Sequence, residues 1–449
     1  MTQAPVAPDG EHGRAGEQVA YGAPAALWRA LERRRPPGPL FRADLWRSPL
    51  RGPWLTAVLG RVLLYGLPVL LVTGLLSYAA YEPRFPGNAF PADPGWLRLP
   101  HFAWPTRPSW LYRVNQGVHV ALGLALVPVV LAKLWSVVPK LFAWPPARSV
   151  AQLLERLSLA LLVGSILFEL ATGVLNIQYW YVFGFDFYTA HYYGAWVFLG
   201  AFAAHVGLKL PAMRAALRTR SLREELRTPL ERTVPEPPDE HGLVAPDPAE
   251  PTLSRRGLLA LVGGGSALVT AVTVGETLGD ALRPTALLSP RGQSYGDGPN
   301  DFQVNRTARA AQVVVDDGWR LVLRGGPAEV VLDRAALLAL PQHVARLPIS
   351  CVEGWSTVQT WSGVRLRDLA ALAGVPDPSS GEVRSLETAG AFSSAVLSGG
   401  QLTDRDSLLA LQVNGVDLSP DHGFPARVVV PAAPGVHCTK WVREIELRA

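Results

Sequence analysis

One of the two cysteines of this chain, Cys351, stands in a short segment in which Gly354 and Trp355 follow it closely. A thiolate held in a tight turn can ligate a metal or act as a nucleophile, whereas a buried thiol packs as a small apolar group. A disulfide with Cys438 is a fourth role, common outside the cytoplasm. Two cysteines are too few for a disulfide framework or a cysteine-ligated iron–sulfur cluster, but the residues alone leave the four roles of Cys351 open.

Three histidines lie within long apolar stretches and could ligate haem iron. His191 and His205 are 14 residues apart, so on one helix they share a face at a separation of about 21 Å. His119 and His191 are each expected near the outer end of a span, at similar depth, where they could hold one haem b between them. His205 is expected nearer the inner surface, where the first and third spans offer no partner for a second haem. Packing or interfacial histidines are the alternative, although ionisable residues inside a membrane are costly and usually functional.

Four apolar spans would position these histidines, and they are expected at residues 62–81, 114–132, 157–177 and 190–208. Each has about the 20 residues needed to cross a bilayer core of about 30 Å. Glu169 is the one acid of the third span, and either a proton path or a polar helix contact would explain it. A composition with 49% hydrophobic and only 18% charged residues is typical of a membrane protein.

Arginines and lysines gather before the first span, between the second and third spans, and after the fourth. The positive-inside rule therefore predicts that both ends of the four-helix unit face the cytoplasm. The same clustering argues against a nucleic-acid-binding stripe, despite a formal net charge of +5. We expect a multi-pass protein of the cytoplasmic membrane, in contact with lipid and with no nucleic-acid partner.

Three further segments complete the predicted organisation around this unit, which occupies residues 54–227. Residues 1–53 are typical of a disordered cytoplasmic tail, and residues 228–253 are a Pro-rich segment predicted to be a flexible linker. Residues 254–280 place Arg255-Arg256 before an uncharged run, which predicts a fifth, anchoring span. The arginine pair is either an ordinary positive-inside flank or a twin-arginine-like export motif, and both readings put residues 281–449 outside the membrane.

Residues 281–449 mix short β-branched runs with short helical runs, without regular βαβ alternation or a Gly-rich dinucleotide fingerprint. The predicted fold class is thus an N-terminal all-α transmembrane bundle, four helices plus the anchor, followed by an α+β domain. We expect strands at 313–315, 320–324, 330–332 and 427–430, and helices at 333–339 and 366–373.

The 14-residue spacing of His191 and His205 on the fourth span carries a family resemblance. Residues 54–212 resemble the four-helix cytochrome b family that serves as membrane subunit of formate dehydrogenases and hydrogenases, whose fourth helix carries one histidine for each of two haems. The resemblance implies haem b and electron exchange with the quinone pool. The first span lacks the histidine that would complete the inner haem.

An ordered set of motifs carries a second resemblance. It runs through Cys351-Val352-Glu353-Gly354-Trp355-Ser356, then Trp361, Gly363, Val364 and Leu366, then HGFPARVVVP at 422–431, then Gly435 and Lys440-Trp441-Val442. Residues 300–449 thereby resemble the molybdopterin-binding domain of the sulfite oxidase family. They are more similar to its single-domain bacterial branch, which includes the periplasmic methionine sulfoxide reductase catalytic subunit.

By position, this resemblance implies that Cys351 is the protein ligand of molybdenum and that Arg427 faces the pterin phosphate, where a planar guanidinium suits an oxyanion. The resemblance implies these pterin-contacting residues: Asn300, Thr388, His422, Arg427, Cys438, Thr439 and Lys440. The chain departs from the reductase branch at His422, where that branch has asparagine, at Gln303, where it has tyrosine, and at the additional ionisable group His437.

We therefore expect a membrane-bound, molybdopterin-dependent oxidoreductase. Its outer α+β domain would be of sulfite oxidase type and fused to its own cytochrome b. The outer domain would exchange an oxygen atom with a small oxo-donating or oxo-accepting substrate, and haem would relay electrons to or from the quinone pool. One alternative is a cytochrome b electron-transfer protein whose outer domain only binds a pterin or a partner, without catalysis. Another is a non-redox membrane scaffold with Cys351 bridged to Cys438.

Overall fold

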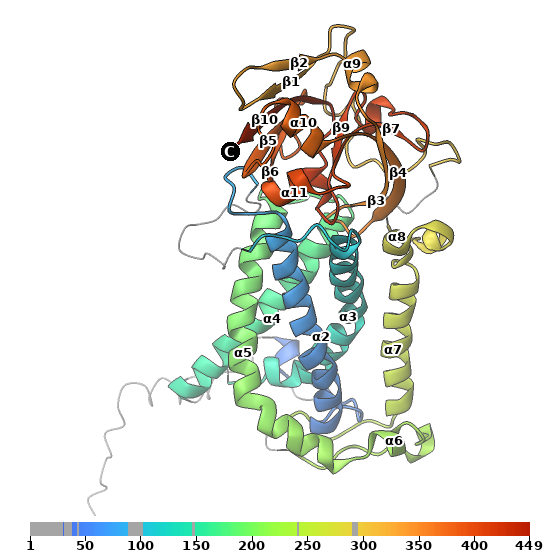
Figure 1. The fold of residues 1–449 in the computed structure, drawn as a ribbon. Coiled ribbons are helices and arrows are strands. Elements are labelled where there is room, and N and C mark those ends of the chain that lie inside the picture. The colour runs from blue at the N-terminus through green and yellow to red at the C-terminus, as the bar shows by residue number, and fades with distance from the viewer. Residues whose placement is uncertain are drawn as a thin grey trace, which may run out of the picture.

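A computed structural model describes residues 30, 38–42, 45–88, 102–145, 149–239, 242–289 and 295–449. The tail predicted at 1–53 lies largely outside these residues. Figure 1 shows a helical part topped at one end by a sheet-rich part.

Four long helices form a bundle, and a fifth stands beside it (Figure 1). The bundle contains α2 (Pro53–Ala80), α3 (Leu111–Leu141), α4 (Val150–Ile177) and α5 (Phe187–Thr219). The fifth long helix, α7 (Arg255–Ala271), packs against α3 and leads into the short helix α8 (Gly275–Leu278). Within the described ranges, five helices are long and apolar enough to cross a membrane. Each of the four predicted spans lies within one of these helices, apart from Tyr81, which follows the last residue of α2, and the helices extend beyond the spans by up to 11 residues.

Side-chain caps fix where three of these helices begin. The first backbone N–H groups of a helix have no partner within the helix, and a Ser or Asp oxygen at the N-cap supplies one. Ser149 accepts from Gln152 before α4, Asp186 accepts from Tyr188 before α5, and Ser254 accepts from Gly257 before α7.

The segment after α5 and the short helix α6 (Leu222–Glu225) differs from the flexible linker expected at 228–253. Glu236 is buried there, and its carboxylate accepts from the backbone N–H groups of Trp54 (2.9 Å) and Leu55 (3.4 Å) at the start of α2. Arg255 is also buried and donates to the Val234 carbonyl oxygen (2.9 Å). The first N–H groups of α2 and the buried guanidinium thus hold this Pro-rich segment against the end of the bundle where α2 begins.

Two five-stranded sheets build the C-terminal part. The first has the order β2-β1-β10-β5-β6, and the second has the order β3-β4-β7-β8 with β9 also paired to β7. Their bounds are β1 Leu321–Arg324, β2 Val330–Leu332, β3 His343–Ser350, β4 Ser356–Arg365, β5 Ser380–Ser385, β6 Ser394–Ser398, β7 Leu408–Val413, β8 Val416–Asp417, β9 Arg427–Val429 and β10 Val442–Arg448. The helices here are α9 (Arg334–Ala339), α10 (Leu366–Leu372) and α11 (Gly399–Thr403).

The mixture of strands and short helices agrees with the α+β prediction, and the strands at 320–324, 330–332 and 427–430 are found as β1, β2 and β9. The strand expected at 313–315 is wrong: this stretch has no strand pairing, and Val314 is 86% exposed, so no neighbouring sheet covers it. Strand β7 shows how the cores are divided. Leu409 and Leu411 face one buried cluster, and Leu408 and Ala410 face another, because alternate side chains point to opposite faces of a strand.

Hydrogen bonds and ion pairs fasten the sheet-rich part to the segment between α2 and α3. Asn88 exchanges hydrogen bonds with the backbone of Val396, and the Trp104 indole donates to the Ala432 carbonyl oxygen (2.7 Å). Arg107 pairs with Asp404 (2.9 Å) and Asp406 (2.6 Å). These contacts place the sheet-rich part at the bundle end where α2 ends and α3 begins, as Figure 1 shows.

Candidate active site and helix-bundle cavity

Cys351 occupies a tight turn between β3 and β4. Its N–H donates to the Trp355 carbonyl oxygen (3.0 Å), and the Gly354 N–H donates back to the Cys351 carbonyl oxygen (3.1 Å). Gly354 has φ +96, a backbone region that favours glycine, and a Cβ there would lie 3.0 Å from the side chain of Val120 on α3. Cys351 is half-buried and no disulfide joins it to the buried Cys438, so the bridged reading of these two residues is wrong.

The chain returns beside this turn at residues 434–440, which contain three of the predicted pterin contacts. Ser350 forms a parallel bridge with Pro434, and the Val428 N–H donates to the Thr439 carbonyl oxygen (2.9 Å), which links this stretch to β9. The structure therefore brings Cys351, Arg427 and residues 438–440 into one region from separate parts of the sequence.

Two buried cations give this region a positive character. Arg427 is 4% exposed, and its guanidinium lies 5.6 Å from the Trp361 ring centre and donates to the His422 carbonyl oxygen (3.4 Å). Burial lowers the pKa of Arg427 to about 10, and the nearby Cys438 opposes that shift. Lys440 donates to the backbone carbonyl oxygens of Asp421 (2.9 Å) and Arg306. Within the described ranges no ion pair neutralises Arg427, so an anionic ligand would relieve a costly buried charge.

Several buried polar atoms in the same region have no hydrogen-bond partner. They are both side-chain amide atoms of Gln303, Nε of Arg427, both ring nitrogens of His437 and Oγ1 of Thr439. Buried polar groups are nearly always paired in folded proteins, so such a cluster fits a polar ligand that would bind there. Burial raises the pKa of the Cys438 thiol and lowers the pKa of His437 to about 4, so both are neutral at pH 7.

Asn300 and His422 support each other at the edge of this region. The Asn300 side-chain amide donates to the Asp417 carbonyl oxygen (3.0 Å) and accepts from the Ser419 N–H (2.9 Å), while the backbone carbonyl oxygen of Asn300 accepts from Nε2 of His422 (2.8 Å). The His422 ring stacks on Phe302 at 3.6 Å. Burial, and then the charge of Arg427, lowers the pKa of His422 to about 3, which keeps it a neutral donor.

Thr388 is another residue that is predicted to contact the pterin. It is exposed, in the loop after β5, although the neighbouring Glu387 is buried and pairs with Arg306 (2.6 Å). Its role toward a pterin stays a prediction, as do the individual pterin contacts of Asn300 and His422.

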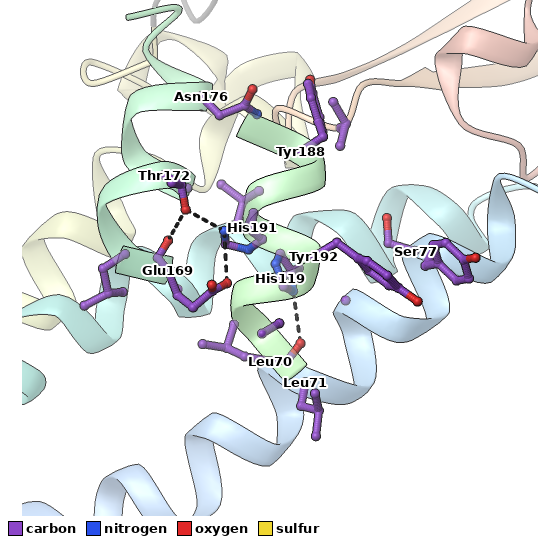
Figure 2. A pocket seen from close by; sticks show the side chains of 18 of the residues that line it. Leu70, Leu71, Ser77, His119, Glu169, Thr172, Asn176, Tyr188, His191 and Tyr192 are labelled. Carbon is purple, nitrogen blue, oxygen red and sulfur yellow. Dashed lines mark hydrogen bonds and ion pairs between the residues drawn. The ribbon is translucent and has the colours of Figure 1, made fainter. Parts of the chain in front are cut away.

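A cavity of about 250 Å³ lies between α2, α3, α4 and α5, and its lining is mostly apolar. His119 of α3 and His191 of α5 both line it, with ring centres 6.3 Å apart and ring planes at 81° (Figure 2). Two imidazoles that bind one metal ion from opposite sides at about 2 Å have ring centres about 6 Å apart. The structure thus brings together the histidine pair expected at similar depth.

Both histidine rings are anchored through the same nitrogen. Nδ1 of His119 lies 3.1 Å from both the Leu70 carbonyl oxygen and the Thr73 hydroxyl. Nδ1 of His191 lies 2.9 Å from the Thr172 hydroxyl and 3.1 Å from the Glu169 carboxylate, as the dashed lines in Figure 2 show. Metal-binding histidines are typically held in this way, which leaves Nε2 for the metal.

Small and unpaired groups in the cavity also suit a large planar ligand. A Cβ at Gly74 would lie 3.1 Å from the His119 ring, so glycine there leaves the ring its space. Oε1 of Glu169 and the Tyr192 hydroxyl are buried without a hydrogen-bond partner, and both residues line the cavity. Glu169 also contacts Nδ1 of His191, so it forms a polar contact between helices, one of the two roles that the sequence suggests for it.

His205 is placed differently from the other two histidines. It is half-buried on α5 outside the cavity lining, and its charged neighbours include Lys133, Lys140 and Lys209. The structure does not pair it with His119 or His191, and a second haem there stays an unsupported prediction.

The sequence does not indicate which residues of the helical part lie against the Cys351 turn and its surroundings. Val352 lines the same cavity as His119 and His191, and its carbonyl oxygen accepts from Gln116 of α3. The ring of Tyr81, which directly follows α2, meets the His437 ring edge-on with ring centres 6.1 Å apart. Gln116 and Tyr81 carry no motif, so only the fold reveals them.

Comparison with known proteins covers the sheet-rich part. A family model described as "Oxidoreductase molybdopterin binding domain" matches residues 308–449. An oxidoreductase of Bacillus subtilis (strain 168), YuiH, is 36% identical over 109 residues, covering 24% of this chain and 54% of that protein. Sulfite oxidase of Gallus gallus is 37% identical over 176 residues, covering 33% of this chain and 38% of that protein. The chain thus spans about half or less of the length of these relatives.

A solved structure, the sulfane dehydrogenase SoxCD from Paracoccus pantotrophus, matches with a TM-score of 0.28 at 24% identity, covering 30% of this chain and 40% of that one. A likeness of this size carries no argument. The similarity of the helix bundle to cytochrome b stays a prediction.

Proposed function

Because its C-terminal region is a molybdopterin-binding oxidoreductase domain of sulfite oxidase type, we propose that this chain is a membrane-bound enzyme that moves an oxygen atom to or from a small substrate. We further propose that it exchanges electrons with the quinone pool through haem b in its own helix bundle. One observation carries the combination: Val352, next to Cys351, lines the cavity that contains His119 and His191.

In this proposal Cys351 holds molybdenum, which when bound supplies two-electron oxygen-atom transfer. The turn between β3 and β4 fixes the position of the thiol. Arg427 and Lys440 provide buried positive charge for the pterin phosphate, and the unpaired atoms of Gln303 and Thr439 provide hydrogen bonds for the polar edge of the pterin.

His119 and His191 would hold haem through Nε2, and haem supplies one-electron transport. Leu70 and Thr73 orient the first ring, and Thr172 and Glu169 orient the second. The cavity excludes water through its largely apolar walls, which suits a haem b site.

The five long apolar helices are compatible with a membrane-spanning region. We propose the orientation that the positive-inside rule predicts, with the α4 start and α5 end in the cytoplasm and the sheet-rich domain outside. Twin-arginine-like export at Arg255-Arg256 would then carry a folded, cofactor-loaded domain across the membrane.

Replacing Cys351 by serine tests the proposal. The purified full-length variant and the unchanged protein would be assayed with sulfite and an oxidised dye, and with nitrate and methionine sulfoxide and a reduced dye. We expect the variant to lose the oxygen-transfer turnover of the unchanged protein and to keep the same haem absorbance spectrum. Retained turnover would remove Cys351 from the proposed role.

A further inference from the structure

The outer end of the helical part holds the Cys351 turn at three successive residues. Gln116 donates through Nε2 to the Val352 carbonyl oxygen (2.5 Å), the Tyr179 hydroxyl donates to the Glu353 carboxylate, and the Thr277 hydroxyl donates to the Gly354 carbonyl oxygen (2.7 Å). These donors come from α3, from the loop after α4 and from α8. Three elements far apart in sequence therefore fix one turn.

Gln116 differs from the other two donors because it lies on the helix that carries His119. The two residues are three positions apart on α3, so they share one face of that helix. Gln116, His119 and Val352 all line the cavity between the helices. The Ser77 hydroxyl of α2 donates to Oε1 of Gln116 (2.8 Å), which fixes the orientation of the amide and directs its N–H toward the turn.

We propose that Gln116 is a positioning residue that couples the two cofactor sites, because it holds the residue next to Cys351 on the helix turn that carries His119. The inference rests on the proposed function. Each oxygen atom transferred corresponds to two electrons, and haem accepts or gives one at a time, so the two sites must exchange single electrons twice per turnover. Electron exchange weakens as the two cofactors move apart. The hydrogen bond from Gln116 to Val352 therefore helps to set its rate, because it fixes the distance between the Cys351 turn and the helix that carries His119.

Gln116→Glu in the full-length holoenzyme isolates the donor. Glutamate keeps the side-chain length and the acceptor for Ser77, and at a pH at which its carboxyl is ionised it offers no donor to Val352, whereas the protonated acid would donate an O–H. Losing one neutral hydrogen bond should raise the population of the opened turn by about fivefold, so amide exchange of residues 351–355 should be about fivefold faster. Spin relaxation of the pentavalent molybdenum signal by ferric haem should also slow, because it reports the separation of the two centres.

Asn88→Ala is the matched control, since it removes the bonds with Val396 that join the same two parts of the protein elsewhere. It should leave amide exchange of 351–355 and the spin relaxation unchanged. Gln116→Leu removes both hydrogen bonds of the amide and provides a second variant should the glutamate protein fail to fold.

Unchanged exchange and unchanged relaxation in the Gln116 variants would overturn the inference. An equal change in Asn88→Ala would also overturn the inference. The faster exchange would then come from a general loosening between the helical part and the sheet-rich part. Absorbance and metal analysis come first: a full-length protein without haem or without molybdenum refutes the proposed function itself, so the two failures are distinct.

Discussion

Arg427→Met is expected to stabilise the molybdenum-free protein and to weaken cofactor binding. Without a ligand the guanidinium is buried, its hydrogen bond to the His422 carbonyl oxygen is long (3.4 Å), and its Nε has no partner among the described residues. Burial lowers the pKa of Arg427 to about 10. At about 1.4 kcal/mol per pKa unit, this shift corresponds to a cost of about 3 kcal/mol for the charged form at pH 7.

Methionine has a similar length and no charge, so the free energy of unfolding of the molybdenum-free domain should rise by about 1–3 kcal/mol. With the cofactor present, the variant loses a charge-assisted contact to the pterin phosphate worth about 1.5–3 kcal/mol. That loss corresponds to about 10- to 150-fold weaker cofactor binding. The two effects have opposite signs because one buried charge is uncompensated in the empty domain and compensated in the loaded one.

The assay is denaturant unfolding of full-length protein from molybdate-free growth, with metal analysis of protein from molybdate-supplemented growth. Arg384→Met is the matched control, since Arg384 pairs with Glu382, Glu444 and Glu446 on the first sheet. It should gain no stability and lose no molybdenum. A less stable empty Arg427→Met protein, or one with an unchanged molybdenum content, would refute this reasoning.

Three other predictions concern separate parts of the protein. His119→Leu should abolish the b-type Soret band while the molybdenum content stays unchanged, and a retained band would contradict the ligand assignment. His422→Asn should flatten the fall in stability between pH 7 and pH 5. Burial lowers the pKa of His422 to about 3, so below about pH 6.5 the unfolded chain binds a proton that the folded domain does not, and the free energy of unfolding falls by about 2 kcal/mol by pH 5. Denaturant midpoints at the two pH values measure this fall. Equal pH dependence in the variant and the unchanged protein would contradict the prediction. Glu236→Ala should destabilise the start of α2 by about 1 kcal/mol through loss of its cap, read as a lower temperature of haem release, and an unchanged temperature would argue against the cap.

The sequence predicted the parts of the fold that repeat a local pattern. Long apolar runs, one of which contains Glu169, located the five long helices, because a span needs continuous apolar surface. The depth argument for His119 and His191 followed from the same runs, and their rings lie 6.3 Å apart in the structure. The segment 313–315 failed because three valines favour a strand only if a neighbour covers them, and Val314 is exposed.

Contacts between distant residues could not be predicted in the same way. Gln116 meets Val352 across 236 positions, and Glu236 caps Trp54 across 182, without any periodicity that would link them. The Pro-rich composition at 228–253 indicated a flexible linker, yet Glu236 in this segment accepts hydrogen bonds from the first N–H groups of α2 and holds the segment in place. The cluster of unpaired polar atoms around Arg427 likewise depends on β9 and residues 434–440 meeting in space.

The amounts of molybdenum and haem bound per chain show whether one protein holds both cofactors. Full-length protein purified from cells supplied with molybdate and iron would be analysed by metal mass spectrometry and by haem absorbance in the same sample. We expect one molybdenum and one haem b per chain, and we expect Cys351→Ser to lose the molybdenum and keep the haem. Haem without molybdenum, molybdenum without haem, or neither would contradict it.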